Sequence, residues 1–371
     1  MRLVLCGIGH AHLPLAASCP DLIEAGIEPV FVSPGPLHYS GMAGGVIGGR
    51  HRVEDATIDA ESAIERGGGT FLRDRCSGLD LDRGLVLLES GGALPFDAVS
   101  FNVGSEARGL EPLPGNAVPC KPLRGPIDLA AELAERRTAA RVAVIGGGAT
   151  GCEIAANLQL RAPSAGVVLL AGGARLSVGG PLCARSAARS LRALGVEVRT
   201  GARVVRLLDS AAVLSSGEEV PFDRAVLATG LRPVRLMQRL GLPTGPRGGL
   251  LVDATLRSVA DARVFAAGDC AEIRDRDLPR LGVFGVRQAP ILLRNVLALA
   301  TCASGKSYSP QRLRLEILNL GRWGLARWGP LFLCARGCLA WKDYLDRTWV
   351  ERSRRALAAG RRTPRIGTCS P

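Results

Sequence analysis

The sequence predicts an α/β protein made of two parallel-sheet domains, the first of them discontinuous, followed by a basic C-terminal region. Two glycine-rich turns carry this prediction, because each follows a short apolar strand and leads into an alanine-rich segment: Leu3–His12 and Arg141–Cys152. A third apolar segment, Val264–Glu272, passes through Gly268-Asp269. A strand, a glycine turn and a helix form the first half of a βαβ unit, whose sheet is parallel. The chain of 371 residues is long enough for two or three such domains.

The remaining elements follow from apolar runs and from the residues that bound them. Short apolar runs that end at glycine or charged residues predict strands at Arg2–Cys6, Glu28–Ser33, Thr70–Cys76, Gly84–Leu88, Ala98–Val103, Arg141–Ile145, Gly166–Leu170, Glu197–Leu208, Ala211–Ser215, Arg224–Ala228 and Val264–Ala267. Alanine- and leucine-rich segments predict helices at Ala11–Ala25, broken at Pro20, and at Ala56–Arg66, Asp128–Arg137 and Pro181–Leu194. The segment Pro34–Gly45 is too rich in glycine for a helix and is expected to be a loop.

Two linkers divide the chain. Residues 112–126 contain five prolines and are expected to cross from the first domain to the second, and residues 245–249 are expected to lead back. The predicted domains are therefore residues 1–125 with 250–310, residues 126–249, and a C-terminal region of residues 311–371.

The first glycine turn predicts a Rossmann-type dinucleotide site. Gly7 and Gly9 occupy the first two positions of the fingerprint, while His12 stands where a third glycine is usual. The acid expected after the second strand is replaced by Ser33 and Pro34. We expect His10 and His12 to contact phosphate or the cofactor rather than a metal, because the four histidines match no standard ligand spacing and no metal site is expected.

The second turn fits the fingerprint better. Gly146, Gly148 and Gly151 have the required spacing, and Thr150 and Glu153 lie in the first turn of the helix that follows. Its second strand also ends without a carboxylate, with Arg175 just beyond, which favours NADPH slightly over NADH or indicates weak nicotinamide affinity. Gly230 closes this domain near the expected pyrophosphate.

The segment around Gly268 completes the functional prediction. Asp269 after an extended strand fits a carboxylate that accepts hydrogen bonds from the ribityl chain of a flavin, and the helix end after it favours charge on the flavin. Two dinucleotides held face to face predict FAD in the first domain and NAD(P)H in the second, hence a flavin-dependent oxidoreductase.

The charge distribution and the cysteine content indicate which partners and which cell compartment to expect. The net charge is +13, and residues 311–371 alone carry thirteen Lys or Arg against four Asp or Glu, together with all four tryptophans. This pattern predicts either a membrane-interface element or a solvent-exposed basic helix pair, while no motif supports nucleic-acid binding. No signal peptide or spanning helix is expected. The eleven scattered cysteines, without a C-x-x-C pair, indicate reduced thiols in the cytoplasm.

These segments resemble the flavoproteins with two dinucleotide-binding domains, and among them the type II NADH dehydrogenase-like proteins. They also resemble the pyridine-nucleotide-disulfide oxidoreductase-like flavoproteins that occur alone or fused ahead of selenide, water dikinase. The resemblance rests on Gly9–His12, Val32–Pro34, Tyr39–Met42, Lys121-Pro122, Gly282–Gln288 and Trp341–Asp346. It implies FAD and NAD(P)H as cofactors and a C-terminal region that touches the membrane and admits a quinone. Cys120 stands where an aliphatic residue is expected before Lys121.

The leading hypothesis is hydride transfer from NAD(P)H to FAD and electron transfer to a quinone-like acceptor. One alternative is a sulfide:quinone oxidoreductase-like reaction at Cys120 with Cys334 or Cys338, and another is a flavin-bound partner protein of selenium metabolism with little turnover. We assign catalytic roles to Lys121, Gln288 and Cys120. The expected FAD contacts also include Ser40, Gly41, Met42, Cys76, Gly104 and Gly268. The expected location is the cytoplasm, and a peripheral position on the inner face of the cell membrane is left open. Whether the protein forms a homodimer is also left open.

Overall fold

The structure, a computed structural model, describes residues 1–136, 138–301, 303–311 and 313–360. The strands of its first parallel sheet are β1 (Arg2–Cys6), β2 (Glu28–Val32), β5 (Thr70–Leu72), β9 (Ala98–Phe101) and β21 (Val264–Ala266). They lie in the order β21-β9-β1-β2-β5. The predicted re-entry of the chain into this sheet is therefore observed, because β21 pairs in parallel with β9.

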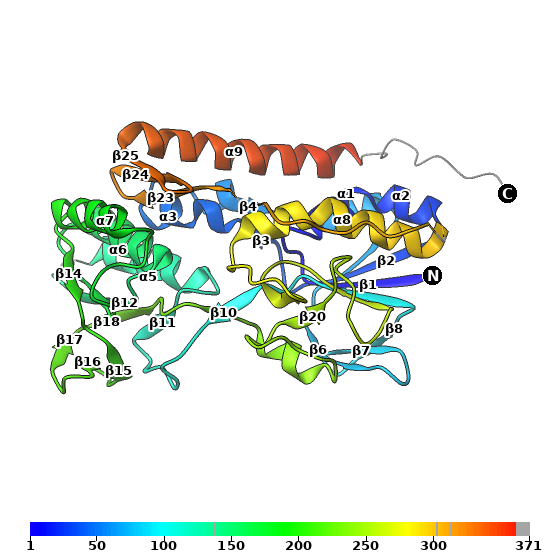
Figure 1. The fold of residues 1–371 in the computed structure, drawn as a ribbon, viewed down its shortest axis with the longest axis horizontal. Coiled ribbons are helices and arrows are strands. Elements are labelled where there is room, and N and C mark those ends of the chain that lie inside the picture. Colours follow the sequence, from blue (N-terminus) through cyan, green and yellow to red (C-terminus); the bar gives the residue numbers. More distant parts are fainter. Residues whose placement is uncertain (137, 302, 312, 361–371) are drawn as a thin grey trace.

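A second parallel sheet lies beside the first, at the left of Figure 1. Its strands are β11 (Ala117–Pro119), β12 (Arg141–Ile145), β13 (Gly166–Ala171), β14 (Glu197–Thr200) and β18 (Arg224–Leu227), in the order β11-β18-β12-β13-β14. The predicted α/β class with two Rossmann-like sheets is confirmed. The predicted domain boundaries remain a proposal, and β11 pairs with the second sheet although it precedes residue 126.

Smaller sheets surround these two. Three-stranded sheets are formed by β6 (Cys76–Asp80), β7 (Leu85–Leu88) and β8 (Ala93–Pro95), by β15 (Val204–Leu207), β16 (Ala211–Leu214) and β17 (Glu219–Pro221), and by β23 (Leu315–Leu320), β24 (Trp323–Trp328) and β25 (Leu331–Ala335). Pairs are formed by β3 (Leu37–His38) with β4 (Thr57–Ile58), β10 (Ser105–Ala107) with β19 (Leu231–Pro233), and β20 (Leu250–Val252) with β22 (Ala271–Ile273). The β10–β19 pair joins the segment that follows β9 of the first sheet to the segment that follows β18 of the second.

The helices cover the sheets and connect them. They are α1 (Leu13–Ala17), α2 (Cys19–Glu24), α3 (Ala43–Ile47), α4 (Glu61–Arg66), α5 (Arg124–Glu135), α6 (Ala149–Arg161), α7 (Pro181–Ala193), α8 (Gly282–Thr301) and α9 (Arg336–Ala359). Short 3-10 turns are η1 (Ser40–Met42), η2 (Glu54–Ala56), η3 (Arg235–Arg239) and η4 (Gly268–Cys270). Helix α9 runs along one side of the molecule past both sheets (Figure 1). It contacts α1 as well as β23 and β24.

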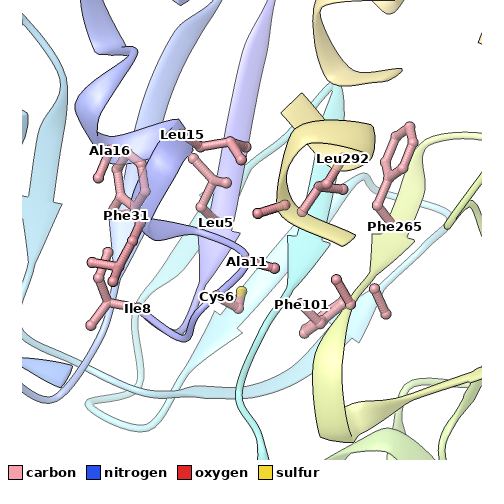
Figure 2. Packing of buried hydrophobic residues seen from close by; sticks show 14 of the residues in the cluster. Leu5, Cys6, Ile8, Ala11, Leu15, Ala16, Phe31, Phe101, Phe265 and Leu292 are labelled. Carbon is pink, nitrogen blue, oxygen red and sulfur yellow. The ribbon is translucent and has the colours of Figure 1, made fainter. Parts of the chain in front are cut away.

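Each parallel sheet has its own core. In the first, Leu5, Phe31, Phe101 and Phe265 come from neighbouring strands, and Leu292 of α8 belongs to the same buried cluster (Figure 2). Gly282–Ala300 of α8 is, among the described residues, the one stretch long and apolar enough to cross a membrane. Its Ala289, Leu292 and Val296 are nevertheless buried in this core, as expected of a helix that covers a sheet.

The prediction that Pro34–Gly45 forms only a loop is wrong, because the segment contains β3, η1 and the start of α3. Glycine allows α3 to approach its neighbours: a Cβ on Gly44 would lie 3.1 Å from Asn157 Nδ2 of α6, and one on Gly45 would lie 2.4 Å from the His51 ring. Close packing against α6 therefore outweighs the low helix propensity of glycine.

Three other elements differ from their prediction for similar reasons. Ala56–Arg66 is helical only from Glu61, because Thr57–Ile58 pairs with β3. Glu197–Leu208 is not one strand, since Gly201 turns at φ +70° and the chain continues into another sheet. The C-terminal region is not a helix pair but an antiparallel sheet with one long helix.

Candidate functional site

The first glycine turn packs so closely against Asn102 that no larger residue fits at Gly7 or Gly9. Gly7 has φ +85°, and a Cβ on it would lie 2.6 Å from Asn102 O. A Cβ on Gly9 would lie 2.2 Å from Asn102 Oδ1. Asn102, which sequence reasoning missed, accepts a hydrogen bond from Ala11 N at 2.9 Å and donates one to Ala267 O at 2.6 Å. The turn thus has the close backbone approach that a dinucleotide pyrophosphate requires.

His12 lies inside this turn and is fully buried. Its Nδ1 lies 2.6 Å from Gly7 O and its Nε2 lies 2.9 Å from Ser100 Oγ. Both ring nitrogens therefore have protein partners, and the predicted contact with phosphate would require one of these bonds to be replaced. Burial lowers the pKa of His12 to about 4, so the ring is neutral.

We predict that His12 makes the folded state sensitive to acid. Its folded pKa of about 4 lies below the ordinary 6.5, so the unfolded chain binds the extra proton first. The contribution is complete above 6.5, is lost as the pH falls towards 4, and is on the order of 3 kcal/mol. Urea unfolding across this range should show a shallower loss of stability in His12→Gln than in the wild type. An unchanged slope in the variant would contradict the assignment.

The Gly268 turn brings together three polar side chains from different elements. Asp269 Oδ2 accepts hydrogen bonds from Ser105 Oγ at 2.6 Å and from Lys121 Nζ at 3.1 Å. Burial alone would raise the pKa of Asp269, but the Lys121 ammonium and the Ser105 hydroxyl outweigh it and hold the pKa below its usual value. Gln288 is buried, and its Oε1 accepts a hydrogen bond from Gly268 N at 2.6 Å. Gln288 therefore fixes the turn that carries Asp269.

His10 contributes a buried polar atom without a partner. Its ring packs against Tyr39, with ring centroids 5.6 Å apart, and against Trp349 of α9 at 5.3 Å. Among the described residues no group hydrogen-bonds its buried Nε2. Burial lowers the pKa of His10 to about 4. A ligand next to Asp269 and Lys121 would satisfy this nitrogen, so the residues present fit a bound flavin nucleotide.

The other predicted FAD contacts lie around the same end of the first sheet. Ser33 Oγ donates to Gly35 O at 2.9 Å, and Pro34 beside it is exposed. Ser40, Gly41 and Met42 form η1, where Gly41 O accepts a hydrogen bond from Lys342 Nζ at 2.8 Å.

The last two predicted FAD contacts are Cys76 and Gly104, which lie at the ends of strands. Cys76 begins β6. A hydrogen bond from the Cys6 thiol lowers the pKa of the Cys76 thiol. Gly104 follows β9 with φ +78° and with no atom near its missing Cβ.

The second glycine turn is even more restrictive. A Cβ on Gly146 would lie 2.1 Å from Ala228 O, and one on Gly151 would lie 1.8 Å from Gly146 O. Gly148 faces open space as the N-cap of the 13-residue α6. Thr150 is exposed in the first turn of this helix, and Gly230 (φ +114°) lies beyond β18. An exposed helix N-terminus behind a glycine turn fits the pyrophosphate of NAD(P)H.

A buried polar network joins α6 to α9. Glu153 Oε1 accepts a hydrogen bond from Asn319 N at 2.6 Å, and burial raises its pKa. Burial alone would lower the pKa of Lys342, but Glu153 and Asp346 outweigh it and raise the pKa. Lys342 Nζ lies 2.8 Å from Asp346 Oδ2, and the Tyr39 hydroxyl donates to Asp346 Oδ1 at 3.0 Å. Sequence reasoning missed Lys342 and Asp346 as site residues, although their i,i+4 spacing was the available signal.

The cysteines considered for sulfide chemistry lie in different surroundings. Cys120 is buried, and burial raises the pKa of its thiol. Cys334 Sγ lies 3.5 Å from Ser190 Oγ, and Cys338 Sγ donates to Leu333 O at 3.7 Å.

An apolar surface lies on the C-terminal sheet and helix, which we call the C-terminal apolar patch. Its residues are Trp328, Leu331, Leu333, Trp341, Tyr344 and Leu345. Leu331 pairs with Trp328 across the β24–β25 hairpin. Trp349 points the other way and stacks on Tyr39 with ring centroids 4.3 Å apart. Of the four tryptophans of the C-terminal region, Trp328 and Trp341 thus lie in the patch and Trp349 lies at the site.

Comparison with known proteins identifies relatives of this arrangement. The sequence profile described as "Pyridine nucleotide-disulphide oxidoreductase" matches residues 1–305. Ferroptosis suppressor protein 1 of Homo sapiens is 25% identical over 259 residues, which cover 66% of this chain and 67% of that protein. The structure of NDH2 from Plasmodium falciparum in complex with NADH has a TM-score of 0.80 at 13% identity and covers 97% of both chains. The sulfide:quinone oxidoreductase of Aquifex aeolicus has a TM-score of 0.79 at 13% identity, covering 96% of this chain and 92% of that one. At this identity the two structures show the shared fold.

Proposed function

Because this chain belongs to the pyridine nucleotide-disulphide oxidoreductase family, we propose that it oxidises NAD(P)H and delivers the electrons to a quinone-like acceptor. It is an oxidoreductase with FAD and NAD(P)H as cofactors. The observation that carries the proposal is the Lys121–Asp269 ion pair, which joins the end of β21 in the first sheet to the segment after β11 in the second. This contact supports two dinucleotide sites that face each other.

The residues of the chain would bind and orient the two cofactors. FAD, when bound, accepts a pair of electrons from NAD(P)H and passes it to an acceptor. Gly7 and Gly9 would receive its pyrophosphate, and Asp269 would accept hydrogen bonds from its ribityl hydroxyls. Lys121 supplies a positive charge next to that position. Gly146 and Gly151 would receive the pyrophosphate of NAD(P)H.

The acceptor end is best supported at α9. Lys342 and Asp346 face Glu153 and Tyr39 on the inner side of this helix, while Trp341, Tyr344 and Leu345 are exposed on it. Glu153 and Lys342 can hold protons, which the reduction of a quinone consumes. A buried protonatable network next to an apolar surface supports an acceptor that is itself apolar.

An anaerobic titration of the purified flavoprotein tests this function. We expect NADH or NADPH to bleach the flavin absorbance and a short-chain quinone to restore it. Bleaching that a quinone does not reverse would contradict the quinone-like acceptor. A flavin that neither nicotinamide reduces would contradict the proposed reaction and favour a partner protein with little turnover.

The alternative reaction, sulfide oxidation through cysteine, has less support because burial raises the pKa of Cys120 and disfavours its thiolate. We predict that Cys120→Ser keeps the rate of NAD(P)H oxidation within about twofold of the wild type, a change of less than 0.5 kcal/mol. Stopped-flow flavin reduction measures it. Bleaching of the wild-type flavin by sulfide, lost in this variant, would instead support the cysteine mechanism.

We also propose that the C-terminal apolar patch contacts the membrane surface. Leu331 and Leu333 are 71% and 62% exposed, and the surrounding region is basic. Replacing both by glutamine should weaken binding to anionic lipid vesicles at least about tenfold, since each leucine contributes apolar burial. Flotation of the vesicles measures this. Leu182→Gln is the control, because Leu182 is 63% exposed on α7, outside the patch, and equal loss in both variants would contradict the proposal.

A further inference from the structure

The carboxyl end of β13 lies where a Rossmann unit distinguishes its dinucleotides. The methyl group of Ala171 lies 2.5 Å from the position that a Cβ on Gly147 would occupy, so this strand end faces the second glycine turn. Units that bind NAD carry an acid here, which accepts a hydrogen bond from the ribose 2′-hydroxyl. The segment Ala171–Leu176 contains no carboxylate.

The side chain of Arg203 lies beside the end of β13, next to Gly172. Ala202 N donates to Ala171 O at 2.9 Å, and Gly201 N donates to Gly173 O at 2.8 Å, so the following turn runs alongside. A Cβ on Gly172 would lie 3.3 Å from Cα and Cβ of Arg203 and 3.5 Å from its Cγ. The stem of Arg203 therefore packs over Gly172, and an acidic side chain at that position would be crowded.

The charge at this position has no protein partner. Arg175 and Arg203 are both exposed, and among the described residues neither guanidinium forms a hydrogen bond or ion pair. By contrast, Arg199 of the neighbouring β14 donates to both carboxylate oxygens of Glu218, at 2.7 and 2.8 Å. Two free guanidinium groups present the donors that suit a phosphate, and they repel no part of it.

We propose that this strand end binds the 2′-phosphate of NADPH, with Arg203 and Arg175 as the residues that determine specificity. The inference rests on the proposed function, because it concerns the same dinucleotide site. A 2′-phosphate replaces the hydroxyl that an acid would have bound, and it receives hydrogen bonds from the arginines. The donor of electrons is then NADPH rather than NADH.

Binding to the oxidised, FAD-loaded protein tests this without turnover. The probes are adenosine 2′,5′-bisphosphate against 5′-AMP, and NADP⁺ against NAD⁺, measured by isothermal titration calorimetry. Hydrogen bonds to a charged group predict roughly 10- to 100-fold tighter binding of the 2′-phosphorylated member of each pair. Higher salt should reduce this preference, because the site is exposed.

Single variants assign the preference to its residues. Arg203→Ala and Arg175→Ala should each weaken NADP⁺ binding about tenfold and leave NAD⁺ binding within about twofold. Arg206→Ala is the matched control, because Arg206 is also exposed and without an ion pair among the described residues but lies on β15. Equal affinity for the two dinucleotides, or arginine variants that behave like the control, would overturn the inference and leave the proposed function intact. Absence of binding by either dinucleotide would overturn both.

Discussion

Gly151→Ala is expected to abolish NAD(P)H oxidation while FAD stays bound. A Cβ at position 151 would lie 1.8 Å from Gly146 O, and this neighbour is backbone that cannot rotate away. The start of α6 must therefore shift from the end of β12, which displaces the exposed N–H groups that would bind the pyrophosphate. We expect the dissociation constant for the dinucleotide to rise at least about 100-fold.

The measurement is flavin content together with the rate of anaerobic bleaching by NADPH. Gly166→Ala is the matched control, because Gly166 begins β13 at the amino end of the strands, away from the glycine turn, and the nearest atom to its missing Cβ is 4.0 Å away. The control should reduce its flavin normally. A Gly151→Ala protein that is also reduced normally would refute the placement of the dinucleotide at this turn.

Asp269→Ala is expected to yield a protein that loses its flavin. The change removes the carboxylate that Ser105 and Lys121 hold, and it leaves the Lys121 ammonium half-buried with the Ser105 hydroxyl but no counter-charge. Loss of one member of such a pair costs about 2 kcal/mol or more of stability, and loss of hydrogen bonds to the cofactor lowers its affinity at least about tenfold.

The pH dependence of stability gives this prediction a second readout. Because the folded pKa of Asp269 lies below its usual value, its contribution is present above the usual carboxyl pKa of about 3.9 and is lost as the pH falls through the folded value. The variant should lack this loss.

A control separates the cofactor from general stability. Asp261 forms a comparable ion pair with Arg263 at 2.7 Å, but that pair lies at the other end of β21. Asp261→Ala should lower the melting temperature and keep the ratio of flavin to protein. Flavin retained in Asp269→Ala would contradict the assignment of Asp269.

The sequence predicted the two sheets well because their signals are local. A short apolar strand followed by glycines needs only neighbouring residues to form its turn, and the clashes at Gly7, Gly146 and Gly151 explain why glycine stands there. The return of the chain to the first sheet could also be predicted, because β21 carries the same signal as β1. The expected position of Asp269 followed from its place after such a strand, whereas Lys121 was expected from the family resemblance, and β11 before it was not predicted.

The sequence predicted the elements between the sheets less well. Helix α3 forms in a glycine-rich segment because it packs against α6, and Thr57–Ile58 is a strand because β3 lies beside it. Neither contact is visible in the local pattern. The surroundings of His12 could not be predicted from the local pattern either. Its burial and its hydrogen bond to Ser100 depend on a strand far along the chain.

By itself, then, the sequence determined that this protein has two dinucleotide-binding turns and a basic C-terminal region. Only the tertiary structure decided that α9 brings Lys342, Asp346 and Trp349 against residues 39–41, about 300 positions earlier, and that Arg203 packs over Gly172. The physical reason is that a glycine turn is fixed by the space its own backbone needs, whereas these contacts exist only after apolar burial has packed α9 and the second sheet in place.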